Sequence, residues 1–327
     1  MSGSETVSTV VSRPVVPGGE LLQLRPWILN RVRRGFTQAE PDVQARLDDV
    51  FSSFAFGYNH VMAPRISQDL SSIPVRLRGF SVEGAAMGAA LGDILTFSGG
   101  RRFESLAALY GAEYIHLIHV GAGWAFARLH RRPWLGVRSG EPLVRWLAWD
   151  GWGFHQALFH PERVFHRHWI EAAARRDARA IRDQGAGRAL WFYAGADPDL
   201  IAAIIGQFPE YRMGDLWAGI GLAASYTGAQ SMDAVERLAR AAGGYRPQLG
   251  QGAAFAAKAH VLAGEVPPSS AEAIGVLTGA EVAVAAEWTD ASLAAVRARE
   301  ADDIAAYQQW RANIMEDVRR RNGGGAG

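Results

Sequence analysis

Residues 218–226 read AGIGLAASY, and close variants of this box of small residues recur along the chain. A period of about 34 residues with helix-forming residues between the boxes is typical of a two-helix repeat. The sequence therefore predicts an all-α single domain of stacked helix-hairpin repeats, of the α-solenoid or α/α-toroid type. The leading glycines of the six boxes are Gly84, Gly121, Gly151, Gly185, Gly219 and Gly252, so the separations are 37, 30, 34, 34 and 33 residues.

Glycine inside a helix costs roughly 1 kcal/mol relative to alanine, so its recurrence needs a packing reason. The close approach of neighbouring helices supplies one, and we expect the glycines to mark helix crossings. The alternative is a phosphate-binding G-x-G loop, which needs a preceding strand and a βαβ context that the sequence does not show. We therefore prefer the crossing interpretation.

Helix start and stop signals fall between the boxes. Asp215 is expected to N-cap a helix that stops at Gly228, and Ser231 is expected to cap the next one. That second helix should end at residues 243–244, with Pro247 opening another. After Pro267 and Pro268, the Ser269-x-x-Glu272 pattern predicts a capping box.

The two ends of the chain differ from its middle. Residues 1–24 and 322–327 are rich in Ser, Thr, Pro or Gly and are predicted to be disordered, which leaves residues 25–321 as the domain. From about residue 290 to Arg321 a broken apolar stripe predicts one long helix that caps the domain, with a homodimer seam as the alternative. The N-terminus has no secretory signal pattern and no apolar run is long enough to span a bilayer, so a cytoplasmic protein without a membrane span is expected.

Composition excludes several classes of function. The 34 basic residues nearly balance the 33 acidic ones, so no global field would hold a nucleic acid. The chain has no cysteine, which excludes disulfides, thiolate catalysis and Cys-ligated metals. Hydrolase and kinase motifs are absent, and no cofactor motif is present, so we expect neither a cofactor nor a metal.

Residues 146–169, WLAWDGWGFHQALFHPERVFHRHW, combine four histidines, an aspartate and four tryptophans. If the indoles of Trp149 and Trp152 desolvate Asp150, its pKa rises and it can act as a general acid, with His155 or His160 orienting it or acting as base. The simpler interpretation is that Asp150 caps a helix and the histidines are structural. The histidine spacings do not match the i,i+4 pattern of a metal site on a helix.

Polar residues also adjoin the boxes, and in a stacked array such positions recur on equivalent faces. They are expected either to line one cavity or concave surface, or to act as caps and inter-repeat hydrogen bonds. The polar residues beside the boxes are Glu83, Asp183, Gln184, Arg188, Asp215 and Gln251. Our candidate catalytic residues are Asp150, His155 and Asp183, and our candidate substrate-binding residues are Trp149, Trp152, His160, Arg188, Trp191, Asp215 and Trp217.

Several long blocks of the sequence resemble one known family. They are RRGF from Arg33, RGFSVEGAAMGAAL from Arg78, RWLAWDGWGFHQALFHP from Arg145, DQGAGRALWF from Asp183, DLWAGIGLAASY from Asp215 and YRPQLGQGAAFAAKA from Tyr245. The chain resembles domain-of-unknown-function family 1702, which is associated with gene clusters for enediyne and related natural products. The resemblance implies a setting in bacterial secondary metabolism and carries no catalytic residues with it.

Three functions follow as hypotheses. The first is an accessory biosynthetic protein that binds a hydrophobic polyene-like intermediate, either without changing it or with its conversion. The second is a cofactor-independent cyclase of an isoprenoid or polyene, with Asp150 as proton donor and indoles stabilising carbocations. The third is a tetratricopeptide-like scaffold for a protein partner such as a biosynthetic enzyme, which predicts exposed aromatics on an open groove. The directions of Trp149, Trp152, Trp191 and Trp217 should distinguish a closed cavity from a surface row.

Overall fold

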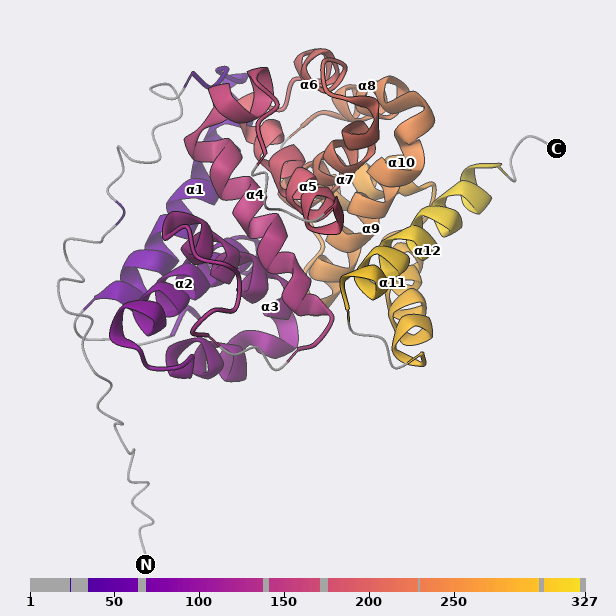
Figure 1. Ribbon diagram of the computed structural model, residues 1–327. Coiled ribbons are helices and arrows are strands. Elements are labelled where there is room, and N and C mark those ends of the chain that lie inside the picture. Colours follow the sequence, from indigo (N-terminus) through magenta and orange to yellow (C-terminus); the bar gives the residue numbers. More distant parts are fainter. Residues whose placement is uncertain are drawn as a thin grey trace, which may run out of the picture.

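The computed structural model describes residue 24 and residues 35–63, 69–137, 141–170, 176–228, 230–299 and 303–323, and every regular element in them is helical. The helices gather into one body (Figure 1), so the predicted all-α single domain is confirmed. The helices are α1 Pro41–Met62, α2 Val75–Thr96, α3 Arg101–Arg128, α4 Ala148–Phe159, α5 Arg176–Tyr193, α6 Pro198–Ile205, α7 Glu210–Thr227, α8 Met232–Ala242, α9 Arg246–Ala263, α10 Pro268–Thr278, α11 Val282–Arg297 and α12 Ile304–Gly323. Short 3₁₀ turns at Val144–Leu147 and Gly243–Tyr245 and a π turn at Glu162–His166 connect them.

The leading glycines of the boxes lie where consecutive long helices cross. A Cβ atom added to Gly151 of α4 would lie 1.9 Å from the carbonyl oxygen of Val120 in α3. One added to Gly185 of α5 would lie 1.9 Å from the carbonyl oxygen of Asp150 in α4. Only glycine allows backbones to approach this closely. The prediction that the boxes mark helix crossings is confirmed.

The crossings share one register. From Gly121 onwards, each leading glycine meets the carbonyl of the residue that directly precedes the previous leading glycine, as Gly219 meets Gln184 and Gly252 meets Ala218. The glycine two positions further on meets the next helix instead, as Gly221 does at the carbonyl oxygen of Leu249. Each central helix is therefore held against both of its neighbours through one pair of small residues.

Short helices alternate with the box helices in the C-terminal half of the chain. The short helices α6, α8 and α10 stand between the box helices α5, α7 and α9 and the helix α11. In the N-terminal half, α2, α3, α4 and α5 follow one another with no intervening α-helix in the described residues. The spacing of the boxes is nearly constant along the chain. In the C-terminal half a second helix lies between successive box helices, whereas in the N-terminal half the same length is taken up by longer box helices or by loops.

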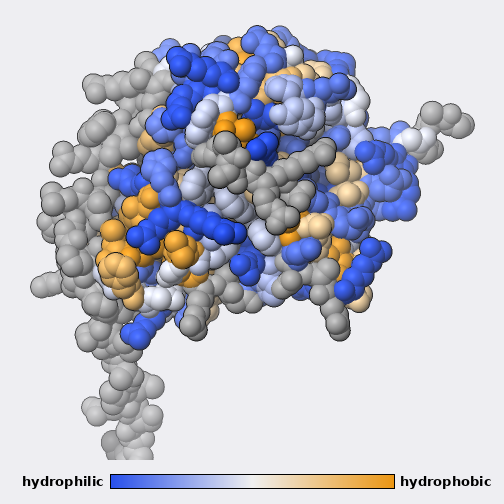
Figure 2. Space-filling view, viewed as in Figure 1, coloured by the Kyte–Doolittle hydropathy of each residue, from blue (hydrophilic) through white to orange (hydrophobic). Residues whose placement is uncertain are grey.

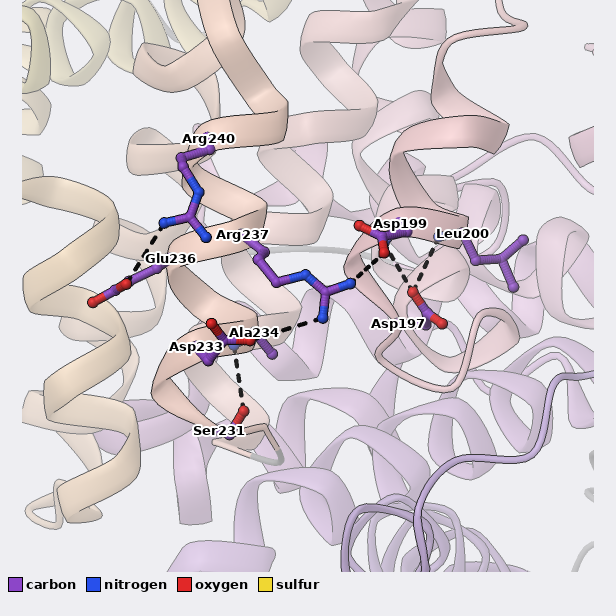
Figure 3. A network of polar contacts seen from close by, with 9 residues as sticks. All are labelled: Asp197, Asp199, Leu200, Ser231, Asp233, Ala234, Glu236, Arg237 and Arg240. Carbon is purple, nitrogen blue, oxygen red and sulfur yellow. Dashed lines mark hydrogen bonds and ion pairs between the residues drawn. The ribbon is translucent and has the colours of Figure 1, made fainter.

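The short helices α6 and α8 are tied together at the surface (Figure 3). Asp197 caps α6 by accepting hydrogen bonds from the backbone N–H groups of Asp199 and Leu200, at 2.8 and 3.1 Å. Ser231 caps α8, as predicted, by accepting from Ala234 N at 3.3 Å. Arg237 of α8 forms an ion pair with Asp199 of α6. These contacts are exposed, so each contributes little to stability.

Two other predicted caps are wrong. Helix α7 begins at Glu210, so Asp215 lies inside the helix and its carboxylate pairs with Arg311 rather than with a helix end. Helix α10 begins at Pro268 after the N-cap Pro267, and no side chain caps it. Both helices start earlier than the polar side chain suggested: α10 has Pro268 in its first turn, where the fixed φ of proline suits a helix, and α7 follows Pro209 at its N-cap. The predicted stop at Gly228, in the left-handed conformation, is confirmed.

The expected single C-terminal helix is instead two, α11 and α12, separated near residue 300. Tyr307, Trp310, Ile314 and Val318 of α12 are buried, as the apolar stripe predicted. Helix α12 lies beside α11 and α9 (Figure 1), where Trp310 donates a hydrogen bond to the carbonyl of Thr289 at 2.9 Å. The stripe thus packs within the domain.

The predicted disordered ends lie almost wholly outside the described residues. Leu24 is described: it is buried and exchanges two backbone hydrogen bonds with the side chain of Asn59. Asn322 belongs to α12 and donates to the carbonyl of Val318 at 2.8 Å. Among the described helices none is by itself long and apolar enough to cross a membrane, although α10 and α11 meet the length and composition test as a pair bent by 62°.

Candidate functional site

A cavity of about 160 Å³ lies at the centre of the helical body. All six box helices, α2, α3, α4, α5, α7 and α9, contribute to its wall, and Phe51 of α1, Thr289 of α11 and Trp310 of α12 complete it. Its lining is mainly aromatic and aliphatic. This central cavity resembles in size an engineered apolar cavity of about 150 Å³ that accepts benzene.

One cluster of charged side chains interrupts the apolar wall. Arg188 of α5 contacts Asp150 Oδ1 at 2.5 Å and Glu83 Oε2 at 3.5 Å. Gln184 donates from Nε2 to Asp150 Oδ2 at 2.8 Å, and Trp124 donates from its indole N–H to Glu83 Oε1 at 3.0 Å. All five residues line the cavity and are buried. The cluster therefore holds two carboxyl groups and one guanidinium away from water.

The register of the glycine crossings explains why these groups meet. Glu83, Asp150 and Gln184 each directly precede a leading glycine, and Arg188 lies one helical turn after Gln184. Because consecutive helices cross at that glycine, the residue before it takes an equivalent place on each helix. The repeated box thus brings polar side chains from distant parts of the chain to one wall of the cavity.

The cluster distributes its charge unevenly. Burial raises the pKa of Glu83, and the nearby negative charge of Asp150 raises it further, while Arg188 opposes the shift. Arg188 makes its short contact with Asp150, which has the geometry of a charge-assisted hydrogen bond. Burial and the nearby negative charge together favour the protonated form of Glu83.

Asp150 does not cap a helix, contrary to the simpler prediction from the sequence. Helix α4 begins at Ala148 after the N-cap Leu147, and no side chain accepts a hydrogen bond from its first turn. Asp150 instead lies in the first turn of α4 and points to Gln184 and Arg188. The ion pair with α5 has overridden the local preference of aspartate for a helix end.

Aromatic rings surround the cluster. Trp124 packs against Phe54 and Phe154, with ring centroids 4.5 and 5.0 Å away. The guanidinium carbon of Arg188 lies 5.0 Å from the centroid of Phe154. These faces favour positive charge at the cavity wall, because the π face of an aromatic ring is electron-rich.

His116 of α3 also lines the cavity. Its Nε2 atom is buried and has no hydrogen-bond partner among the described residues. Burial, with the neighbouring charge of Arg188, lowers the pKa of His116 to about 3, so the imidazole is neutral at ordinary pH. The wall therefore carries a neutral group that can donate or accept one hydrogen bond.

A second ion pair lies at the more exposed part of the lining. Lys258 of α9, which is the single lysine of the chain, contacts Asp290 of α11 at 2.7 Å. The side chain of Asp290 is 53% exposed, whereas those of Arg188 and Glu83 are at most 7% exposed. The cavity is therefore polar at the partly exposed Lys258–Asp290 pair and at the buried cluster around Arg188, and the rest of its lining is mainly apolar.

Of the residues that the sequence singled out, Asp150 and Arg188 line the cavity. His155 lies behind the wall, with its ring 5.8 Å from Trp124 and 4.6 Å from Phe159. His160 is the exposed residue that follows α4.

Four tryptophans were expected to distinguish a closed cavity from a surface row. They neither line the cavity together nor form a row on the surface. Trp191 and Trp217 are buried outside the described lining, and the indole N–H of Trp191 donates to Thr227 at 3.1 Å. Trp149 and Trp152 pack against each other with ring centroids 5.7 Å apart and ring planes tilted by 43°. The indoles that do line the cavity are those of Trp124 and Trp310.

The two remaining acidic candidates belong to other contacts. Asp183 makes a bidentate ion pair with Arg212 of α7, at 2.6 and 2.8 Å. Asp215 pairs with Arg311 of α12 at 2.8 Å, and Arg311 also donates to Gln251 at 3.2 Å. These pairs join neighbouring helices, which is the inter-repeat role that the sequence offered as an alternative to lining a cavity.

From the sequence we placed Glu83 and Gln184 beside the boxes without choosing them as site residues, and we did not choose His116. The signal for the first two was their place directly before a leading glycine, which they share with Asp150. His116 carries no such signal, because it lies one turn before the box of α3. Among the described residues no group of three His, Asp or Glu side chains could hold a metal ion.

These features define an all-helical protein whose central helices cross through glycines and enclose an apolar cavity with a buried carboxyl–arginine cluster. The family model described as a protein of unknown function (DUF1702) matches residues 20–318. The chain belongs to this family. No curated protein and no solved structure matches it.

Proposed function

We propose that the protein binds a hydrophobic small molecule in its central cavity, and that this molecule is a polyene-like intermediate of bacterial natural-product biosynthesis. The apolar lining is the observation that carries the proposal, because a partly enclosed apolar cavity with a few convergent polar groups is typical of a small-molecule site. The biosynthetic setting rests on the resemblance of the sequence to enediyne-associated chains. A cytoplasmic location is part of the same proposal.

The repeat architecture belongs to the proposal as well. We infer that the boxes mark stacked units that curve into a ring, as in an α/α-toroid, rather than an open α-solenoid. Two observations support a ring: residues from α1 to α12 face one cavity, and Arg46 of α1 donates to the carbonyl of Gly228, after α7, at 2.7 Å. A ring of this kind provides a closed wall for a ligand.

A second function, conversion of the ligand by a cofactor-independent cyclase, is favoured by the buried carboxyl cluster. Glu83 is the better candidate for the proton donor than Asp150, because burial raises the pKa of Glu83 and Arg188 lies 3.5 Å from Glu83 but 2.5 Å from Asp150. Transfer of the Glu83 proton to an alkene carbon would leave a carbocation beside the rings of Trp124 and Phe154. Ring closure and loss of a proton would then give an isomer of the substrate.

The scaffold hypothesis has less support. It predicts aromatic residues along an open groove, whereas Trp124, Phe154 and Trp310 line the cavity. Figure 2 shows a face on which hydrophilic residues are interspersed with separate groups of apolar ones. A homodimer or a biosynthetic enzyme as partner stays a prediction.

Native mass spectrometry tests the binding proposal. The protein is purified from cells that carry its biosynthetic genes, as wild type and as Ala223→Phe, which places a ring in the cavity from α7. Ala203→Phe on the exposed side of α6 is the matched control. We expect wild type and the control to retain a hydrophobic molecule and the cavity variant to lose it. Empty wild-type protein with a stoichiometric protein partner would favour the scaffold instead.

The cyclase proposal is tested on any ligand found in this way. Glu83→Gln should retain the ligand unchanged, while wild type converts it to an isomer. Asp183→Asn is the matched control, because Asp183 is also a buried carboxylate but lies outside the cavity lining. Equal conversion by the Glu83 and Asp183 variants would exclude Glu83 as the donor.

A further inference from the structure

Two residues of the cavity wall have a buried polar atom without a hydrogen-bond partner among the described residues, namely His116 at Nε2 and Gln184 at Oε1. Glu83, Asp150 and Arg188 satisfy one another, and Gln184 gives its amide N–H to Asp150. His116 lines the same cavity, yet its buried Nε2 atom has no partner among the described residues. A buried polar atom without a hydrogen bond costs free energy, so an unpaired one in a binding cavity calls for an explanation.

Neighbouring contacts do not supply the missing partner. The adjacent histidine of the same helix, His119, is satisfied in the ordinary way, since its Nδ1 atom bonds the carbonyl of Ile115 at 2.8 Å. His119 lies outside the lining, packed against Phe103 and Trp134. His116 faces the cavity instead, one turn before Val120. The free atom therefore points to the cavity contents.

We propose that His116 recognises an oxygen atom of the ligand, so that the ligand is a neutral, largely apolar molecule that carries one hydroxyl or carbonyl group. A neutral imidazole can accept a hydrogen bond from a hydroxyl or donate one to a carbonyl. A hydrocarbon would leave Nε2 unpaired. This inference rests on the proposed function of the cavity as a ligand site and adds the class of ligand.

The charge around His116 agrees with a neutral ligand. Arg188 faces it from the cluster, and His119, Lys258 and His260 are the other groups that act on it electrostatically. Lys258 is already paired with Asp290, and Arg188 with Asp150 and Glu83. No unpaired cation is left in the described lining to hold an anionic group.

Small probes of the size of the cavity test the inference. Two pairs of equal size differ in one oxygen: p-cresol with p-xylene, and benzaldehyde with styrene. Isothermal titration gives their affinities for wild type, for His116→Phe and for His116→Gln, which restores a donor and an acceptor. His166→Phe is the matched control, because His166 is exposed and outside the lining.

We expect the affinity ratio of at least one oxygenated probe to its hydrocarbon partner to fall about threefold to tenfold in His116→Phe, the value of one neutral hydrogen bond. His116→Gln should recover part of that ratio, and His166→Phe should leave it unchanged. Hydrocarbons that bind wild type and His116→Phe with no change in either ratio would overturn the role of His116. If no probe binds wild type, the proposed ligand site itself fails.

Discussion

At the residue scale, the central feature of the cavity wall is one guanidinium between two buried carboxyl groups. Arg188 is at most 7% exposed in its side chain, and it contacts both Asp150 and Glu83. Buried ion pairs contribute little net stability when intact, yet removing one partner leaves uncompensated charge in a medium of low dielectric. The cluster is therefore held together more by the cost of breaking it than by the attraction within it.

The Arg188→Met substitution measures this cost. We expect it to lower the free energy of unfolding by about 3–5 kcal/mol at pH 7, since it leaves Asp150 and Glu83 facing each other. Glu83→Gln, which removes one negative charge and keeps the side-chain shape, should change stability far less. Urea unfolding at equilibrium measures both. An Arg188→Met protein as stable as Glu83→Gln would contradict the ion-pair description.

A second prediction at this scale concerns pH. Burial lowers the pKa of His119 to about 4, against a bond to the Ile115 carbonyl that raises it. The folded state therefore favours the neutral ring, so its contribution to stability is complete above about pH 6.5 and is lost as the pH falls towards 4.

We expect this one group to account for about 3 kcal/mol of acid destabilisation, at roughly 1.4 kcal/mol per pKa unit. His119→Gln should reduce the slope of unfolding free energy against pH between 6.5 and 4, and His116, with a pKa of about 3, keeps part of the slope. His166→Gln, at an exposed position, should leave the slope of wild type. Identical slopes in all three proteins would show that His119 titrates normally.

At the scale of the element, the glycine boxes set how the helices cross. Gly111 and Gly151 are both helical glycines, but an added Cβ at Gly111 would meet only Ile115 Cδ1, at 3.6 Å. At Gly151 it would meet the carbonyl oxygen of Val120 at 1.9 Å, which requires α3 and α4 to move apart. The same substitution should therefore have opposite effects at the two positions.

Gly111→Ala should raise the free energy of unfolding by up to about 1 kcal/mol, the gain in helix propensity. Gly151→Ala should lower the free energy of unfolding by about 1–3 kcal/mol or more, which is the cost of overpacking the crossing. Thermal unfolding of the two variants beside wild type gives the comparison. A neutral Gly151→Ala would mean that the crossing is looser than described.

The crossings were predictable from the sequence, whereas only some of the helix ends were, for a physical reason. A close crossing demands glycine, so the boxes register the contact directly in the sequence. Helix ends depend on local capping in competition with tertiary partners, and the partners prevailed at two sites. The carboxylate of Asp215 forms an ion pair with Arg311, and that of Asp150 forms one with Arg188, instead of capping a helix.

For the whole molecule, the sequence predicted the helical class and part of the site. Asp150 and Arg188 were identified and do share the cavity, whereas the aromatic residues chosen with them pack elsewhere. Composition favours an aromatic pocket but cannot say which rings line it. The cavity arises where helices from both ends of the chain meet, and His116 has its place only there. Long-range placement of this kind leaves no periodic trace in the sequence.

We infer that the apolar cavity in the middle of this molecule accepts a hydrophobic small molecule. Diffraction from crystals kept under xenon tests it most directly, because xenon enters apolar cavities of this size. We predict xenon density between Phe154 of α4 and Ala223 of α7 in wild type, and none at that place in Ala223→Phe. A centre that stays free of xenon in wild type, filled by side chains alone, would contradict the account.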